Sequence, residues 1–183
     1  MPNVRTIDRF CRWRVQSGPF LLAAVFLAAH PDWRSLAMGL GIVALGLLLR
    51  AWAAGHIQKE KTLAVSGPYR HSRNPLYLGN LILGIGIAVA VRSWWGALLV
   101  GLYFALFYPP VILVERGRME RLFPQAYKDY AAQVPLFFPR LTPAPGFNDS
   151  PFRWTLYRRN RESRALLGTG LVWLILVAKM IIF

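Results

Sequence analysis

The chain has 183 residues, 55% of them hydrophobic, and its 22 basic residues outnumber the 8 acidic ones for a formal net charge of +14. Because this apolar fraction exceeds that of ordinary soluble domains and the basic residues fall between apolar runs, the composition indicates a membrane protein rather than a nucleic-acid-binding domain. A single cysteine excludes an internal disulfide, and the three histidines lack partners at metal-ligand spacing, so no metal site is expected.

The first two apolar runs are predicted to pair as a helical hairpin over residues 13–54. Glycines in the second run allow a neighbouring helix to approach closely, namely Gly39, Gly41 and Gly46. Arg50 lies near the end of that run. We expect its long side chain to reach the lipid headgroups, with a polar cavity inside the protein as the alternative.

The middle of the sequence contains two more apolar runs and a segment with a helical pattern. A third span is predicted over 76–91 and a fourth over 94–114, in which Pro109 and Pro110 should kink the last turn. Apolar residues then recur at intervals of three and four over 115–133. This spacing predicts an amphipathic helix, interrupted near Phe123-Pro124, that lies along the membrane surface.

A proline-rich and basic connector over 141–164 leads to a final span over 165–183. The chain is therefore predicted to be a single all-α domain, a polytopic membrane helical bundle with about five transmembrane helices and an amphipathic helix on the cytoplasmic face. Eighteen of the 22 basic residues fall on one side of this arrangement. The positive-inside rule then predicts a cytoplasmic N-terminus, and the short, basic chain favours a bacterial inner membrane.

The side chains most suited to chemistry lie in a turn at 67–79 and just after the fourth span. The turn reads Gly-Pro-Tyr-Arg-His-Ser-Arg-Asn-Pro-Leu-Tyr-Leu-Gly. Glu115 is expected at the same membrane face, where an ionised carboxylate needs a cation or water. Arg73 is its expected partner because a planar guanidinium matches a carboxylate. Such a pair could serve chemistry or could only hold two helices together.

Two motifs follow one another in a distinctive order. Gly67-Pro68-Tyr69 and Arg73-Asn74-Pro75-x-Tyr77-x-Gly79 come first, and Glu115 follows after a further span, with aromatic residues and prolines behind it. This order resembles the integral-membrane methyltransferases, a superfamily that includes isoprenylcysteine carboxyl methyltransferase and the phospholipid methyltransferases. The resemblance covers about residues 50–140 and implies a methyltransferase-like core over 55–140.

In that superfamily, such a turn and an acidic pair after the fourth span enclose S-adenosylmethionine at the cytoplasmic face, and a lipophilic substrate enters from the bilayer. The resemblance therefore implies cofactor-binding roles for Tyr69, His71, Arg73, Asn74, Tyr77, Gly79 and Glu115, with His56 as a further pocket candidate. Arg73 and Glu115 are the catalytic candidates. Arg73 would neutralise the methionine carboxylate or hold an anionic substrate group, and Glu115 would hold the methionine ammonium or accept a proton from an amine.

The chain departs from the superfamily pattern at two positions. Asn74 stands where many members have histidine, although an amide can still form hydrogen bonds to a ligand. Arg116 occupies the second acidic position, which puts in doubt a mechanism that needs two adjacent carboxylates. Glu120 lies about 140° further round a helix than Glu115 and cannot simply replace it.

Aromatic and basic residues outside these motifs are expected to contact the membrane. Tyr127 and Tyr130 are predicted to be amphipathic anchors at the interface. The basic run over 153–164 is predicted to bind lipid headgroups and set the topology, with membrane lipids as partners and no nucleic acid.

Two other functions stay open from the sequence. One is an NADPH-dependent steroid or isoprenoid reductase, a class with a similar order of motifs. Those enzymes resemble this chain less, because they commonly place glutamate directly after the glycine of the turn, where this chain has Asn80. The other is a membrane scaffold without catalysis.

Overall fold

The computed structural model describes residues 4–58 and 62–182, with the side chains of 4–12, 14 and 15 outside the description. Every regular element in this part of the chain is helical, which confirms the all-α class. The elements are α1 (Val4–Leu27), α2 (Trp33–Ala54), the short 3-10 helix η1 (Gly67–Arg70), α3 (Pro75–Val91), α4 (Trp94–Leu122), α5 (Pro124–Gln133), α6 (Trp154–Arg159) and α7 (Ser163–Ile182).

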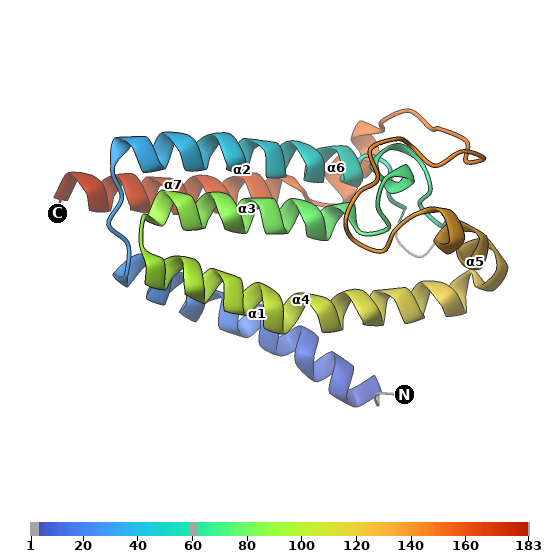
Figure 1. Ribbon diagram of the computed structural model, residues 1–183, viewed down its shortest axis with the longest axis horizontal. Coiled ribbons are helices and arrows are strands. Elements are labelled where there is room, and N and C mark those ends of the chain that lie inside the picture. The colour runs from blue at the N-terminus through green and yellow to red at the C-terminus, as the bar shows by residue number, and fades with distance from the viewer. Residues whose placement is uncertain (1–3, 59–61, 183) are drawn as a thin grey trace.

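The long helices run side by side and leave the irregular segments at one end of the bundle. Figure 1 shows α2, α3 and α7 together, with α1 and α4 beneath them. Helices α5 and α6 and the longer loops lie at one end of the bundle, on the right in this view. Helix α2 packs mainly on α3, and α1 packs mainly on α4. Each of the first two helices thus takes a later helix as its main partner, and the hairpin predicted for residues 13–54 stays a prediction.

The close packing of α2 on α3 depends on small residues. A Cβ on Gly39 would lie 2.6 Å from the backbone oxygen of Gly86, and one on Gly46 would lie 2.9 Å from that of Gly79. Only glycine lets the two backbones approach so closely, which agrees with the prediction for Gly39 and Gly46. The same prediction for Gly41 is wrong, since nothing lies within 4 Å of a Cβ built there.

Helix α2 begins with a cap at the opposite end of the bundle from the loops. The Asp32 carboxylate accepts a hydrogen bond from the Ser35 amide at 2.7 Å, and the Ser35 hydroxyl accepts one from the Asp32 amide at 3.0 Å. Arg92 lies 2.9 Å from the same carboxylate. The Ser35 amide is the main cause of the lowered pKa of Asp32. This cap ties the turn before α2 to the turn after α3.

Three helices are long and apolar enough to cross a membrane by length and composition, namely α2, α4 and α7. Two shorter apolar helices accompany them, Gln16–Leu27 within α1 and Pro75–Val91. The protein is therefore a helical membrane protein. The total of about five spans stays a prediction.

Helix α4 continues past both of its prolines, so the helix boundary predicted at residue 115 is wrong, whereas the interruption predicted near Phe123-Pro124 is confirmed. Pro109 and Pro110 lie inside one helix that ends only at Leu122, and α5 starts separately at Pro124. A proline inside a helix removes its own N–H donor and crowds the carbonyl four residues earlier, and spanning helices tolerate this because neighbouring groups can satisfy the freed backbone. Glu115 therefore lies within a long continuous helix, and the chain folds back only at α5.

The connector over 141–164 also contains structure that the sequence pattern missed. The six-residue helix α6 lies within it, and the Arg153 amide donates to the Gly55 carbonyl oxygen at 3.0 Å. The Asn160 side chain donates to the carbonyl oxygens of Ala54 and Ile57 at 2.9 and 3.2 Å. These bonds satisfy carbonyl groups at the end of α2 and hold the start of α7 beside that helix.

Candidate functional site

The turn at 67–79 is held in place by the segment that follows α5. The Arg73 amide donates to the carbonyl oxygen of residue 135 at 3.0 Å, and the Asn74 side-chain amide donates to that of residue 136 at 2.9 Å. The Ser72 hydroxyl donates to the carbonyl oxygen of residue 137 at 2.7 Å. Because these bonds fix the backbone on both sides of Arg73, its side chain is directed from a rigid base.

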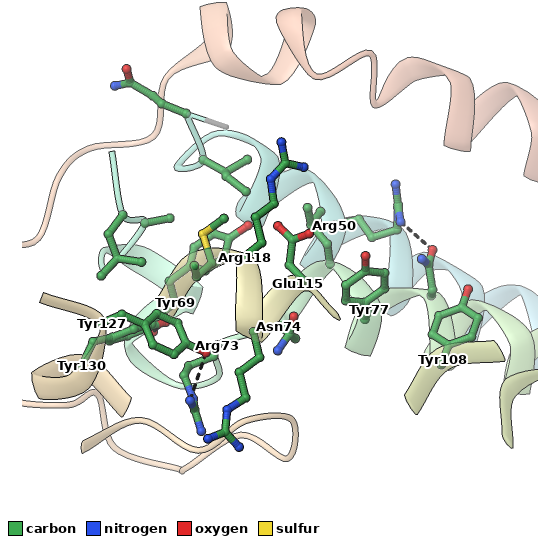
Figure 2. A pocket seen from close by; sticks show the side chains of 18 of the residues that line it. Arg50, Tyr69, Arg73, Asn74, Tyr77, Tyr108, Glu115, Arg118, Tyr127 and Tyr130 are labelled. Atoms are coloured by element: carbon green, nitrogen blue, oxygen red, sulfur yellow. Dashed lines mark hydrogen bonds between the residues drawn. The ribbon is translucent and has the colours of Figure 1, made fainter. Parts of the chain in front are cut away.

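A cavity of about 630 Å³ lies between this turn, the ends of α2 and α3, the second half of α4, and α5. Its size is within the range typical of small-molecule sites. The sequence-predicted residues that line it are Tyr69, Arg73, Asn74, Tyr77 and Glu115. Figure 2 shows Arg73 near Tyr127 and Tyr130, with Glu115 and Tyr77 further along the cavity. The cavity thus joins the turn to the carboxylate on α4.

Arg73 lies on an aromatic wall of this cavity. Its guanidinium donates to the Tyr127 hydroxyl at 3.1 Å, and the guanidinium carbon lies 5.5 Å from the centre of the Tyr127 ring. No ion pair joins Arg73 to Glu115 in the part of the chain that the structure describes, so the predicted pairing is wrong. The Arg73 Nε is buried without a hydrogen-bond partner among the described residues. Leaving a buried N–H donor unpaired costs free energy, so this nitrogen indicates where a bound ligand could place a hydrogen-bond acceptor.

Tyr127 and Tyr130 form part of the cavity wall, and their predicted role as interface anchors is wrong. Their side chains are 3% and 1% exposed. The Tyr130 hydroxyl donates to the Tyr69 carbonyl oxygen at 2.7 Å. Burial raises the pKa of Tyr130, so its hydroxyl stays protonated and donates across the physiological pH range. The helical spacing revealed one apolar face of α5 but not that this face turns towards the protein.

Tyr69 presents a second unpaired polar group to the cavity. Its hydroxyl is buried and has no hydrogen-bond partner among the described residues. Burial raises the pKa of Tyr69 well above its ordinary value, so the group is a neutral hydroxyl that can donate or accept. Together with the Arg73 Nε, it gives the cavity two polar atoms that a bound molecule could satisfy.

Arg50 and Glu162 form a buried ion pair at the opposite side of the cavity. The Arg50 guanidinium donates to both carboxylate oxygens of Glu162 at 2.8 Å and also to the Asn80 side-chain oxygen. The favoured prediction that Arg50 reaches the headgroups is wrong, and the alternative of a polar cavity is confirmed. Sequence reasoning missed Glu162, whose partner lies 112 positions away. The one available signal was an acidic residue in the middle of a basic run.

Three sequence-predicted site residues do not line the cavity. His56 is hydrogen-bonded to the Trp52 and Ser150 carbonyl oxygens at 2.8 and 3.0 Å, and the His71 Nδ1 lies 2.9 Å from the Arg140 carbonyl oxygen. Gly79 packs against α2. These contacts position the backbone around the cavity. A direct contact of the three residues with a cofactor stays a prediction.

The arrangement suits a ligand that carries opposite charges. Glu115 lines the same cavity as Arg73. A cationic group near Glu115 and an anionic group near Arg73 would each receive charge-assisted hydrogen bonds. The described residues contain no group of three or more metal-ligating side chains.

The fold and the cavity define a helical membrane protein with a polar site at one end of its bundle. The family model of the Phospholipid methyltransferase family matches residues 35–126, which include the turn and Glu115. The chain belongs to this family.

Two curated relatives are similar over most of their length. One is the cobalt-zinc-cadmium resistance protein CzcN of Cupriavidus metallidurans, 34% identical over 94% of this chain and 83% of the relative. The other is the nickel-cobalt-cadmium resistance protein NccN of Alcaligenes xylosoxydans xylosoxydans, 34% identical over 75% of this chain and 67% of the relative. No solved structure matches the chain.

Proposed function

We propose that this protein transfers a methyl group from S-adenosylmethionine to a lipophilic acceptor at the cytoplasmic face of a bacterial inner membrane. The observation that carries the proposal is the cavity in which Glu115, Arg73 and Tyr69 meet at the end of a bundle of apolar helices. Membership of the Phospholipid methyltransferase family supports the same chemistry.

The residues of the cavity fit this cofactor. Its methionine part carries an ammonium and a carboxylate, which Glu115 and Arg73 would hold. The unpaired Tyr69 hydroxyl and Arg73 Nε offer further hydrogen bonds. S-adenosylmethionine, when bound, supplies a methyl group on a sulfonium whose leaving group is neutral, so in-line placement in a dry pocket contributes most to the rate. The rigid turn and the buried tyrosines of α5 provide that placement.

The acceptor is proposed to be either an isoprenylcysteine-type carboxylate or an amine in a lipid headgroup. For an amine, Glu115 would accept the proton that the nitrogen loses. For a carboxylate no base is needed, and Glu115 would only orient the cofactor. The pH dependence of methylation by the unchanged protein tests this point once an acceptor is known, since only amine methylation needs a group that accepts a proton.

The names of the two relatives suggest a physiological setting. Both are named for resistance to divalent metals. We propose that methylation by this chain acts within such a resistance system. Expression of the chain in a metal-sensitive bacterial host should then raise tolerance to cobalt or cadmium, and the Glu115→Gln variant should not. Equal tolerance with the wild type and the variant would show that resistance does not depend on Glu115.

Calorimetric binding of S-adenosylhomocysteine to the detergent-purified full chain tests the proposed cofactor. We expect saturable binding that Arg73→Ala or Glu115→Gln abolishes while the thermal unfolding midpoint shows that each variant is folded. Glu120→Gln is the matched control, because that carboxylate is exposed on the same helix and does not line the cavity. Binding of NADPH alone would favour the reductase, and binding of neither would favour a scaffold.

A further inference from the structure

A second hollow of about 340 Å³ lies between α2 and the corner where α6 meets α7. We call it the α2–α7 groove. Its walls are apolar side chains, namely Ala44, Leu47, Leu48 and Ala51 of α2 and Leu166 of α7. Polar residues occur at its end near the α6–α7 corner, where Tyr157 and Glu162 complete the lining. A hollow with one polar end suits an amphipathic molecule.

The α2–α7 groove lies between two helices that could cross a membrane. Helices α2 and α7 are both long and apolar enough to cross a membrane, and Figure 1 shows α7 running beside α2. The lining residues on α2 extend from Ala44 to Ala51, which corresponds to about 10 Å along the helix axis. Leu48 and Leu166 remain more than half exposed, so the groove is open from the side on which lipid chains would lie.

Glu162 connects this groove to the polar cavity, because its side chain lines both hollows. Its carboxylate is held by Arg50, which lines only the polar cavity. The Arg50–Glu162 ion pair thus lies at the boundary between the apolar α2–α7 groove and the polar cavity that Glu115 lines. A molecule with a hydrocarbon chain in the groove would present its polar end to this boundary.

We propose that the α2–α7 groove holds the acyl chain of an acceptor lipid with an amine headgroup, and that the Arg50–Glu162 pair marks where that headgroup enters the polar cavity. That the bound lipid is a methyl acceptor rests on the proposed function. A hydrocarbon chain gains little by leaving lipid for a protein groove, since both are apolar. The chain is therefore localised by the headgroup to which it is attached, held at the polar end.

Photolabelling in a bilayer tests the occupant directly. The full chain is placed in phosphatidylcholine nanodiscs with a phosphatidylethanolamine whose acyl chain carries a diazirine, and adducts are mapped by mass spectrometry after illumination. We expect adducts concentrated at 44–51 and at Leu166. A long-chain hydrocarbon with the same diazirine and no headgroup should label the lipid-facing helices evenly. Even labelling by both probes, or equal labelling of the groove by both, would overturn the proposal.

Matched variants connect the labelling to the groove. Ala44→Phe places a ring in the groove and should abolish the concentrated labelling. Ala37→Phe is the control, because Ala37 lies two turns earlier on the same face of α2 and does not line the groove. Leu166→Trp fills the groove from the other wall and serves as a second variant, with thermal unfolding as the check on folding. Labelling that survives both groove variants would contradict the proposal.

The labelling and the cofactor experiment can fail separately. Concentrated labelling without binding of S-adenosylhomocysteine would leave the groove as a lipid site and reject the proposed methyl transfer. Binding of S-adenosylhomocysteine with even labelling would support the cofactor site and reject the groove.

Discussion

Replacing Glu162 by glutamine tests whether the ion pair with Arg50 organises the site. The carboxylate accepts hydrogen bonds from the Arg50 guanidinium at 2.8–3.1 Å, and the two side chains are only 9% and 14% exposed. Glutamine keeps the shape but removes the charge. The Arg50 charge would then stay buried with neutral partners only.

The expected effect is large because water cannot screen the remaining charge. Removing one partner of a buried pair typically costs about 3–5 kcal/mol. For a chain of this length each kcal/mol lowers the unfolding midpoint by about 2–4 °C, so Glu162→Gln should lower it by about 6–20 °C. Thermal unfolding of the purified protein in detergent measures this shift.

Two further variants make the result specific. Glu120→Gln breaks the exposed pair with Arg116 on one face of α4, where both side chains are nearly half exposed, and should cost only about 0.3–0.5 kcal/mol. Replacing Arg50 by methionine and Glu162 by leucine together removes both charges, and should recover most of the loss because no charge stays buried. Equal shifts for Glu162→Gln and Glu120→Gln would refute the reasoning, as would a double variant no more stable than the single one.

Three other predictions concern the turn, the helix contact and the cap. Tyr130→Phe removes the hydroxyl that donates to the Tyr69 carbonyl oxygen and should cost about 1–3 kcal/mol in thermal unfolding; unchanged stability would contradict its burial. Gly39→Ala brings a Cβ to 2.6 Å from the backbone of α3 and should cost about 1–3 kcal/mol, whereas Gly41→Ala meets open space and should gain up to about 1 kcal/mol; equal midpoints would exclude the close contact. The pKa of Asp32 is lowered in the folded protein, so its stabilising effect is present above the ordinary carboxyl pKa and is lost as the pH falls through the lower folded value. The unfolding midpoint of the wild type should fall at acidic pH, and that of Asp32→Asn should fall less. Parallel curves for the two proteins would contradict this role of Asp32.

Much of the site was visible in the sequence because its residues are near one another along the chain. The turn at 67–79 brings four of the sequence-predicted cavity-lining residues together locally, Tyr69, Arg73, Asn74 and Tyr77, and its two prolines restrict the backbone. Glu115 comes directly after an apolar run, which is enough to place a carboxylate near the end of a helix. All five of these residues line the cavity.

The roles of α5 and of the chain after it could not be read from the pattern. The apolar face of a helix must be kept from water, but its composition does not reveal whether it contacts lipid, packs on protein or forms part of a cavity wall. The pattern therefore predicts Tyr127 and Tyr130 at the interface, whereas the folding back of α5 buries them. The cause is the break between α4 and α5 together with the bonds from residues 135–137 to the turn.

The sequence by itself determined that this is an all-α membrane protein with a polar turn and a carboxylate at the ends of its helices. Those features follow from composition, periodicity and short-range motifs. Only the tertiary structure decided which helices pack together and that Arg50 meets Glu162 across 112 positions. The physical reason is that an ion pair between distant segments leaves no local pattern, because each partner alone is one charge at the end of an apolar helix.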